Sequence, residues 1–403
     1  MTVVSYTFSH KGTPMISRLK AKLNRRQMLG AASAATVGAA LLPAFAKAEE
    51  PKSYQVGKDP GKHEPIADFK FDIEATTGWV GEAGSAKEAT VEEFPASQHI
   101  AGVSMRLKPG GIRELHWHAI AAEWALVLEG TVRTTVITPS GESSTDLFEP
   151  GDIWYFPKGH GHLLQNVSNH DAHFVLGFDD GHFSEFGTFS ITDWVARTPQ
   201  HLVARNLNLD PATVANLPKK ELYILPGKIP ENPLEGNISG DLENPQTSHK
   251  FSLSKMAPLT FPGGWERIVT AKEFPINTTL TSVMQYLEPG AMREMHWHPN
   301  ADEWQYYING RSRITVFGAH GRAKTEEFGP GQIAFIQQGF GHYVEQVGSE
   351  PTKFFALFNS PTFEEISISK WLAGNPASLI SDNFLITKEE VARLPRKTLG
   401  IIK

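Results

Sequence analysis

The 403 residues are enough for two ordinary domains with full cores, and 40% hydrophobic with 20% charged residues is a globular composition. The net charge of −6 and the lack of a long basic run argue against nucleic acid as a partner. The chain has no cysteine, which excludes thiolate nucleophiles, zinc–cysteine sites, iron–sulfur clusters and disulfides.

Residues 1–48 differ in composition from the rest of the chain. Adjacent Arg25 and Arg26 precede an alanine-rich, uncharged stretch from Met28 to Ala46, and residues 46–48 have the small-x-small pattern of a signal-peptidase site. A membrane anchor is the alternative, because the stretch is about long enough to span a bilayer, but it is poor in Leu, Ile and Phe. The arginine pair resembles a twin-arginine export signal. We therefore expect residues 1–48 to be cleaved on export to the periplasm or medium, leaving no membrane association.

An internal repeat dominates the remainder of the chain. The segment Leu107–His118 returns as Leu287–His298, and His162 returns as His342 at the same offset. A period of this length indicates duplicated domains rather than a solenoid of small repeats.

We expect the first domain to span residues 49–228 and the second 229–403, with the proline-rich residues 225–245 as the linker. The two copies lose register once, because copy one has three extra residues within Ser184–Phe189. The sequence therefore predicts that the domains differ in one loop.

Each copy reads mainly as strands. Residues 124–128 and 131–137 lie on either side of a Glu-Gly pair. Residues 305–308 and 311–317 lie on either side of Asn309-Gly310, a strong hairpin signal. Short strands with turns at close spacing predict an antiparallel barrel or sandwich.

A short helical segment closes each copy. Asp210 followed by Pro211 is typical of a helix N-terminus, and Thr387 with Glu390 predicts a capping box.

Four residues of metal-ligand type recur at matching positions. His116 and His118 share one face of a strand, Glu123 follows after a short turn, and His162 comes from a separate hairpin. Copy two repeats the set with His296, His298, Glu303 and His342. Histidines satisfied within the core are the alternative, but eight matched residues favour one metal ion per domain. Such ligands suit Mn, Fe(II), Co, Ni or Zn.

Several other histidines have no such partners in the sequence. We interpret His160 as a rim residue. We interpret the others as surface or structural residues: His170, His173, His182, His201, His249 and His320.

These motifs resemble the cupin superfamily. The matching residues are Gly111, His116, His118, Glu123, Gly130, Gly151, Pro157 and His162. Residues 100–110, 188–194 and 303–308 narrow the resemblance to the bicupin oxalate decarboxylases, and it extends from about Phe69 to about Pro395. It implies an all-β fold of two tandem cupin (jelly-roll-like) β-barrel domains with short flanking helices.

The resemblance also implies an activity. The family splits oxalate into formate and carbon dioxide with manganese in both domains, and it requires dioxygen without net consumption. We therefore expect two Mn ions per chain, dioxygen as co-catalyst and oxalate as the small-molecule partner. Arg113 and Arg293 match arginines that bind the substrate, and a guanidinium fork fits a carboxylate. Strand parity would put Arg113 on the face opposite His116, so its role requires a bulge or turn near Glu114.

Residues 184–189 match the family's mobile lid. Glu185 stands at the position of the acid that protonates the decarboxylated product, and Thr188 at the threonine that helps to close the lid. Phe186-Gly187 replaces the small polar residues that are typical there. The resemblance therefore implies catalytic roles for Glu185, Arg113 and Thr188.

Copy two departs further from the family. Its lid is shortened to Glu364-Glu365-Ile366, and Ala356 stands where the family has another acid. We therefore expect the first domain to hold the main catalytic site and the second to bind metal with little turnover. Trp117 and Trp297 are interpreted as packing residues rather than as electron carriers.

Three alternatives stay open. An oxalate oxidase would yield carbon dioxide and hydrogen peroxide, and Glu185 argues against it. A non-catalytic exported manganese-binding bicupin would need neither Arg113 nor Glu185. The ligand set would also suit a dioxygenase or isomerase acting on another small acid. The resemblance further implies a homo-oligomer, a trimer or hexamer.

Overall fold

The computed structural model describes residues 65–235 and 248–403. The predicted export signal and part of the predicted linker lie outside the described residues. No helix in the described ranges combines the length and the apolar character needed to span a bilayer.

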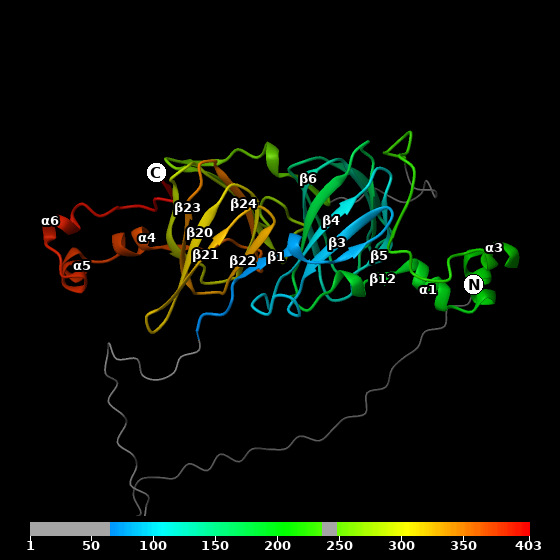
Figure 1. Ribbon diagram of the computed structural model, residues 1–403, viewed down its shortest axis with the longest axis horizontal. Coiled ribbons are helices and arrows are strands. Elements are labelled where there is room, and N and C mark those ends of the chain that lie inside the picture. Colours follow the sequence, from blue (N-terminus) through cyan, green and yellow to red (C-terminus); the bar gives the residue numbers. More distant parts are fainter. Residues whose placement is uncertain (1–64, 236–247) are drawn as a thin grey trace, which may run out of the picture. The chain divides into compact units, whose positions relative to one another are not determined.

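Two sheets form the first half of the molecule (Figure 1), and their paired strands are antiparallel. One sheet has the order β14-β9-β6-β11-β4-β3-β2: β2 (Trp79–Val80), β3 (Gly84–Ala89), β4 (Ala101–Leu107), β6 (Glu123–Glu129), β9 (Asp152–Phe156), β11 (Ala172–Phe178) and β14 (Lys250–Ser252). The other has the order β12-β5-β10-β7-β8, with β13 also on β5: β5 (Ile112–Trp117), β7 (Val132–Ile137), β8 (Ser143–Phe148), β10 (Gly161–Asn166), β12 (Phe189–Ser190) and β13 (Ile224–Leu225).

The second half repeats this arrangement. Its larger sheet has the order β1-β22-β19-β24-β17-β16-β15: β1 (Lys70–Asp72), β15 (Leu259–Phe261), β16 (Gly264–Val269), β17 (Thr281–Leu287), β19 (Glu303–Asn309), β22 (Gln332–Ile336) and β24 (Thr352–Phe358). Its smaller sheet has the order β21-β20-β23-β18-β25, with β26 also on β18: β18 (Met292–Trp297), β20 (Ser312–Gly318), β21 (Arg322–Phe328), β23 (Gly341–Gln346), β25 (Ile366–Ser367) and β26 (Ile401–Ile402).

The predicted two-domain, all-β architecture with short helices is confirmed. The sequence analysis expected closed β-barrels, and the structure differs on this point. Within the described residues, no hydrogen-bonded ladder joins the two sheets of a half, so each domain is a β-sandwich. Strands β14 and β2 are the edge strands of the first larger sheet.

The two halves exchange strands. Strand β1 precedes the first domain but pairs with β22 of the second, with Lys70 opposite Ala334. Strand β14 precedes the second domain but pairs with β9 of the first, with Lys250 opposite Trp154. Each domain's larger sheet is therefore completed by the segment that leads into the other domain.

Both faces of the larger sheets are buried. On β6, Ala125 and Val127 belong to the core of the first sandwich, while Trp124 and Leu126 belong to a cluster shared with the second half. The Trp124 and Trp304 rings lie 5.2 and 5.8 Å from the ring of Phe355 in that cluster. This explains why β6 reads as a continuous apolar run from Trp124 to Leu128.

Glycine permits the close approach of the two halves. A Cβ atom at Gly102 on β4 would lie 2.3 Å from Trp304 Cζ2, and one at Gly177 on β11 would lie 2.1 Å from Leu357 Cδ1. The interface therefore depends on the missing side chains at these two strand positions.

Helices flank each sandwich and extend away from the sheets in Figure 1. The α-helices are α1 (Ile191–Arg197), α2 (Gln200–Leu207), α3 (Pro211–Ala215), α4 (Ile368–Ala373), α5 (Ala377–Phe384) and α6 (Lys388–Val391). The 3-10 helices are η1 (Ile73–Ala75), η2 (Glu185–Gly187) and η3 (Leu253–Lys255). The Asp210 side chain caps α3, and Thr387 with Glu390 forms the predicted capping box of α6.

Candidate metal centres and their lids

A bulge in β5 brings the candidate substrate and metal residues together. On β10, His162 lies opposite His116 and Leu164 lies opposite Arg113, so three steps on β5 match two on β10. The extra residue reverses the alternation of faces, so Arg113 and His116 both point into the sandwich. The bulge that the sequence required for Arg113 is therefore present.

The second half has the same bulge. On β23, His342 lies opposite His296 and Val344 lies opposite Arg293. Both halves thus place one arginine beside one histidine cluster.

The eight predicted ligands form two buried groups. Within each group, one ligand atom per residue lies within 4.8 Å of the corresponding atoms of the other residues. The groups are His116, His118, Glu123 and His162 in the first half and His296, His298, Glu303 and His342 in the second.

Backbone carbonyls orient the imidazoles. His116 Nδ1 lies 2.5 Å from the Glu114 carbonyl oxygen and His162 Nδ1 lies 2.9 Å from that of His160. Because a carbonyl only accepts, Nδ1 carries the proton in each ring and the Nε2 lone pair is left free. His296 is held in the same way by the Glu294 carbonyl, at 2.6 Å.

The free atoms of the first group fit a divalent metal ion. The Nε2 atoms of His116, His118 and His162 and Oε2 of Glu123 are buried and have no hydrogen-bond partner. Burial lowers the pKa of His116 and His118 well below the usual value, so these rings are neutral, as a metal ligand requires. Buried polar atoms that converge in this way without partners need a cation to satisfy them.

The carboxylate ligands are supported differently in the two halves. Trp154 Nε1 donates to Glu123 Oε1 at 2.6 Å in the first half. In the second half, Gln305 Nε2 donates to Glu303 Oε1 at 2.8 Å, and Tyr307 O–H donates to Gln305 Oε1 at 2.9 Å. Each donor fixes one carboxylate oxygen and leaves the other for the metal.

The lid of the first half is closed over its centre. Glu185 opens η2 and is only 1% exposed. Arg113 Nε donates to Glu185 Oε1 at 2.7 Å, and Arg113 Nη2 donates to Thr188 Oγ1 at 2.5 Å. The structure therefore brings together the three residues to which the sequence assigned catalytic roles.

The second carboxyl oxygen of Glu185 points towards the metal ligands. Oε2 has no hydrogen-bond partner and lies 3.7 Å from His118 Nε2. Burial raises the pKa of Glu185 to about 7, although neighbouring Arg113 acts to lower it. This carboxyl group thus has both the position and the proton affinity of an acid serving the centre.

A residue that the sequence analysis missed holds this lid. Glu88 on β3 accepts from Ser184 Oγ at 2.9 and 3.0 Å and from the backbone N–H of Glu185 at 3.0 Å. The repeat contained a signal, because Glu88 corresponds to Ile268 in copy two, whose lid is shorter.

Two further carboxylates, Glu114 and Glu294, hold the bulges in place, and the sequence analysis assigned them no role. Glu114, inside the β5 bulge, accepts from the backbone N–H groups of Tyr223 and Leu222 at 2.7 and 3.0 Å and from Thr192 Oγ1 at 2.5 Å. Glu294 does the same in the second half, accepting at 2.7 Å from the backbone N–H of Gly400. These carboxylates tie each bulge to the chain that returns from the flanking helices.

The second lid takes a different form. Glu365 accepts a hydrogen bond from Arg293 Nη2, and the backbone oxygen of Glu364 lies 2.8 Å from His298 Nδ1. Ala356 is buried on β24 opposite Val283 and carries no proton donor.

The tryptophans beside the ligands pack against their own halves. Trp117 stacks on Phe189 at 5.4 Å and meets Trp194 edge-on at 5.8 Å, while Trp297 meets Trp371 at 5.6 Å.

Two histidines outside the ligand groups, His160 and His249, lie close to each other. His249 is buried and neither ring nitrogen has a hydrogen-bond partner, and its ring lies 5.8 Å from that of His160.

Removing one ligand should empty one centre only. We expect His162→Ala to lower the bound metal from two ions per chain to one. Loss of one of the four ligands weakens metal binding in the first half, and the ligands of the second half are unchanged. Elemental analysis of purified protein measures this. His170→Ala, an exposed histidine outside both groups, should keep two ions, and the idea of independent centres fails if His162→Ala loses both.

Removing Glu88 should loosen the lid. A hydrogen bond to a charged group contributes about 1.5 kcal/mol, so Glu88→Ala should raise the open fraction of the lid by about tenfold. Limited proteolysis should then cut faster within residues 184–189, with the metal content unchanged. The exposed Glu92→Ala serves as the control, and equal cleavage of both variants would contradict a holding role for Glu88.

Known proteins share this fold and these motifs. Residues 79–215 and 251–392 each match the Cupin family. Oxalate decarboxylase OxdC of Bacillus subtilis (strain 168) is 39% identical over 345 residues, covering 85% of this chain and 88% of that protein. A probable oxalate decarboxylase of Arthroderma benhamiae is 32% identical over 342 residues, covering 84% of this chain and 83% of that protein.

Solved structures agree with the sequence matches. A structure of the Bacillus subtilis oxalate decarboxylase, from work on its Mn(II) centres, has a TM-score of 0.81 at 37% identity. The match covers 85% of this chain and 90% of that chain. Two cupin domains, 39% sequence identity to an oxalate decarboxylase and a shared fold over 85% of its length show that the chain belongs to the bicupin oxalate decarboxylase family.

Proposed function

We propose that this protein is a manganese-dependent oxalate decarboxylase, that it releases formate and carbon dioxide, and that the first half is the main catalytic site. The observation that carries the proposal is the closed lid, where Arg113 and Glu185 meet beside three histidines and a glutamate. The two ligand groups would hold two Mn ions per chain.

Arg113 is the group that would bind the substrate. The protein carries a net charge of −6, so a dianion needs a local positive centre. Arg113 is fully buried, its guanidinium lies 4.3 Å from the Tyr223 ring, and its Nη1 donates to the Tyr223 carbonyl at 3.4 Å. In the closed lid Nε and Nη2 are engaged by Glu185 and Thr188, so opening of the lid would free this fork for one oxalate carboxylate while the other would face the metal ligands.

Glu185 is the group that would supply the proton. When bound, manganese supplies, together with dioxygen as co-catalyst, the one-electron chemistry that weakens the carbon–carbon bond of oxalate. Loss of carbon dioxide would then leave a radical anion whose carbon must gain a proton and regain the electron removed from oxalate to become formate, so the overall reaction is redox-neutral. The carboxyl group of Glu185 faces that position from inside the closed lid, where Thr188 and Arg113 hold the loop and exclude water.

The second half would bind metal and contribute little to turnover. Its ligand group is complete, but among the described residues no ion pair joins Glu365 to a ligand histidine, whereas Glu185 Oε2 lies 3.7 Å from His118 Nε2. Ala356 adds no acid. An oxalate oxidase would need no proton donor over the centre, so the placement of Glu185 favours decarboxylation.

Removing the acid should abolish formate production. We expect Glu185→Gln to lower the rate of formate release by about 10²-fold or more, because a positioned general acid contributes about 10²–10⁴-fold. The matched control is Glu365→Gln in the second lid, which should stay within about twofold. A formate assay with parallel detection of hydrogen peroxide measures both variants.

Two results would count against this assignment. Equal loss in both variants, or loss only in Glu365→Gln, would move catalysis to the second half. Hydrogen peroxide instead of formate from the unmodified protein would identify an oxidase, and neither product would support a metal-binding protein without this activity.

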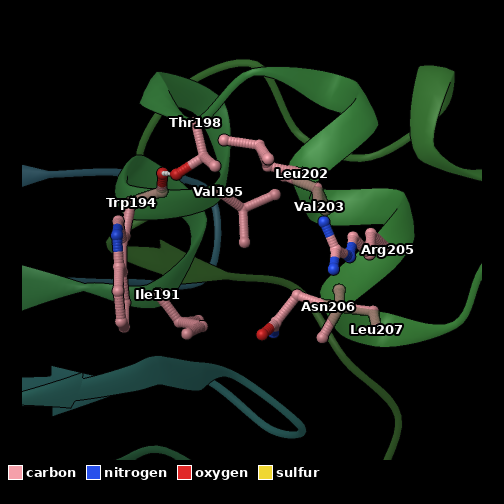
Figure 2. A pocket seen from close by; sticks show the side chains of 9 residues that line it. All are labelled: Ile191, Trp194, Val195, Thr198, Leu202, Val203, Arg205, Asn206 and Leu207. Atoms are coloured by element: carbon pink, nitrogen blue, oxygen red, sulfur yellow. Dashed lines mark hydrogen bonds between the residues drawn. The ribbon is translucent and has the colours of Figure 1, made fainter.

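The helical arms support assembly into a homo-oligomer, a trimer or hexamer. A groove of about 670 Å³ lies between α1 and α2. Figure 2 shows Trp194 and Ile191 at one side of it and Leu202 and Leu207 at the other. Both arms carry exposed large apolar side chains, which are Trp194, Leu202, Leu207, Trp371, Leu379 and Phe384. Surfaces of this kind on a soluble domain favour a protein partner, here a second copy.

Light scattering tests the assembly. The mass should be three or six times that of one chain, and Trp194→Glu should shift it towards the monomer, because a charge is costly to bury at an interface. The exposed Lys158→Glu on the first sandwich should leave the mass unchanged. A single-chain mass for the unmodified protein would contradict the proposal.

Export by the twin-arginine pathway also remains part of the proposal, on the basis of residues 1–48. Replacing Arg25 and Arg26 by lysine should retain the protein in the cytoplasm, as cell fractionation would measure. Arg18→Lys, outside the pair, should leave export intact. Continued export of the double variant would exclude this pathway.

A further inference from the structure

A buried carboxylate lies beside Arg293 in the second half. Glu266 on β16 is 4% exposed, and its Oε2 lies 3.8 Å from Arg293 Nε. The constant offset between the two copies places Ala86 at the same position in the first half. The first half therefore has no acid at this point of the sandwich.

The neighbour of Glu266 also differs from its counterpart in the first half. Gln285 on β17 donates from Nε2 to Glu266 Oε2 at 3.1 Å. The residues that correspond to Glu266 and Gln285 in the first half are Ala86 and Met105, and both belong to the apolar core. An apolar pair on neighbouring strands has thus been replaced by a polar pair, which holds the carboxylate in place.

The two arginines consequently differ in charge balance. Arg113 forms an ion pair with one carboxylate, that of Glu185. Arg293 is paired with two, those of Glu365 and Glu266, and it is itself 2% exposed. In a buried site little water screens these charges, so their balance decides which anions are admitted.

In both halves a carboxylate lies next to the Nε atom of the arginine. Arg113 uses Nε to bind Glu185 of the lid, and opening of the lid would remove this carboxylate from the arginine. The Nε of Arg293 faces Glu266, which belongs to a strand of the sandwich and stays in place when any lid opens. An oxalate dianion at the second centre would therefore compete with the Glu266 carboxylate for Arg293.

We infer that Glu266 is a specificity-determining residue, which compensates the charge of Arg293 and keeps oxalate out of the second centre. The inference rests on the proposed function and deepens it, because it assigns the inactivity of the second half to a named side chain. The second half then holds its metal as a structural ion, and oxalate binds once per chain.

Oxalate-binding stoichiometry tests the inference without relying on turnover. Isothermal titration of manganese-loaded protein with oxalate is carried out in the Glu185→Gln background, and formate is assayed afterwards to verify that oxalate persists. The parent should bind one oxalate per chain and Glu266→Ala should bind two, because Arg293 then keeps a single carboxylate partner, Glu365 of the lid. Glu266→Gln removes the charge but keeps the size and the bond to Gln285, and it should also bind two.

Matched variants separate charge from packing. Gln285→Met removes the partner but keeps the carboxylate, so one oxalate should still bind. Ala86→Glu transfers the acid to the first half and should reduce binding from one to none. Elemental analysis should find two Mn ions per chain in every variant, and thermal denaturation should show folded protein.

The outcomes distinguish the inference from the proposed function. Two oxalates bound by the parent, or one bound by both Glu266→Ala and Glu266→Gln, would overturn the role of Glu266 while leaving the first site intact. No oxalate bound by the parent would instead contradict the proposed function at the first half, and the inference would fall with it.

Discussion

One extra residue in a strand determines the chemistry of each half. Without the bulge in β5, Arg113 would point to the face opposite His116, and no cation would lie beside the ligands. The bulge persists because Glu114 inside it accepts three hydrogen bonds from Tyr223, Leu222 and Thr192. The same carboxylate thus joins the metal centre to the flanking helices, and Glu294 repeats this in the second half.

The duplicated centres share a metal-binding shell but differ in what surrounds it. Orientation of the imidazoles through Nδ1 is common to both halves, because it depends on backbone carbonyls that the fold supplies. The side chains that surround Arg113 and Arg293, in contrast, differ between the two halves. The first half has Glu88 holding a long lid, whereas the second has Ile268 at that place, a short lid and Glu266.

The larger sheets explain why the two halves have stayed together. Strands β1 and β14 cross between the domains, and the cluster around Trp124 and Trp304 buries the outer faces of both sheets. A domain separated from its partner would lose a strand and expose this apolar surface. The second half therefore has a structural function besides any catalytic one.

Local and repeated patterns in the sequence determined much of this protein. His-x-His spacing, the constant offset between the copies and the Asn309-Gly310 turn depend only on neighbouring residues or on comparison of the two copies. They were sufficient to predict the eight ligands and the paired β domains, whereas the expectation for Glu185 came from the resemblance to a known family. The contacts of Glu88 and Glu266 and the strand exchange were decided only by the tertiary structure. Each joins residues far apart in the chain, and their pairing depends on how the sheets pack rather than on any local propensity.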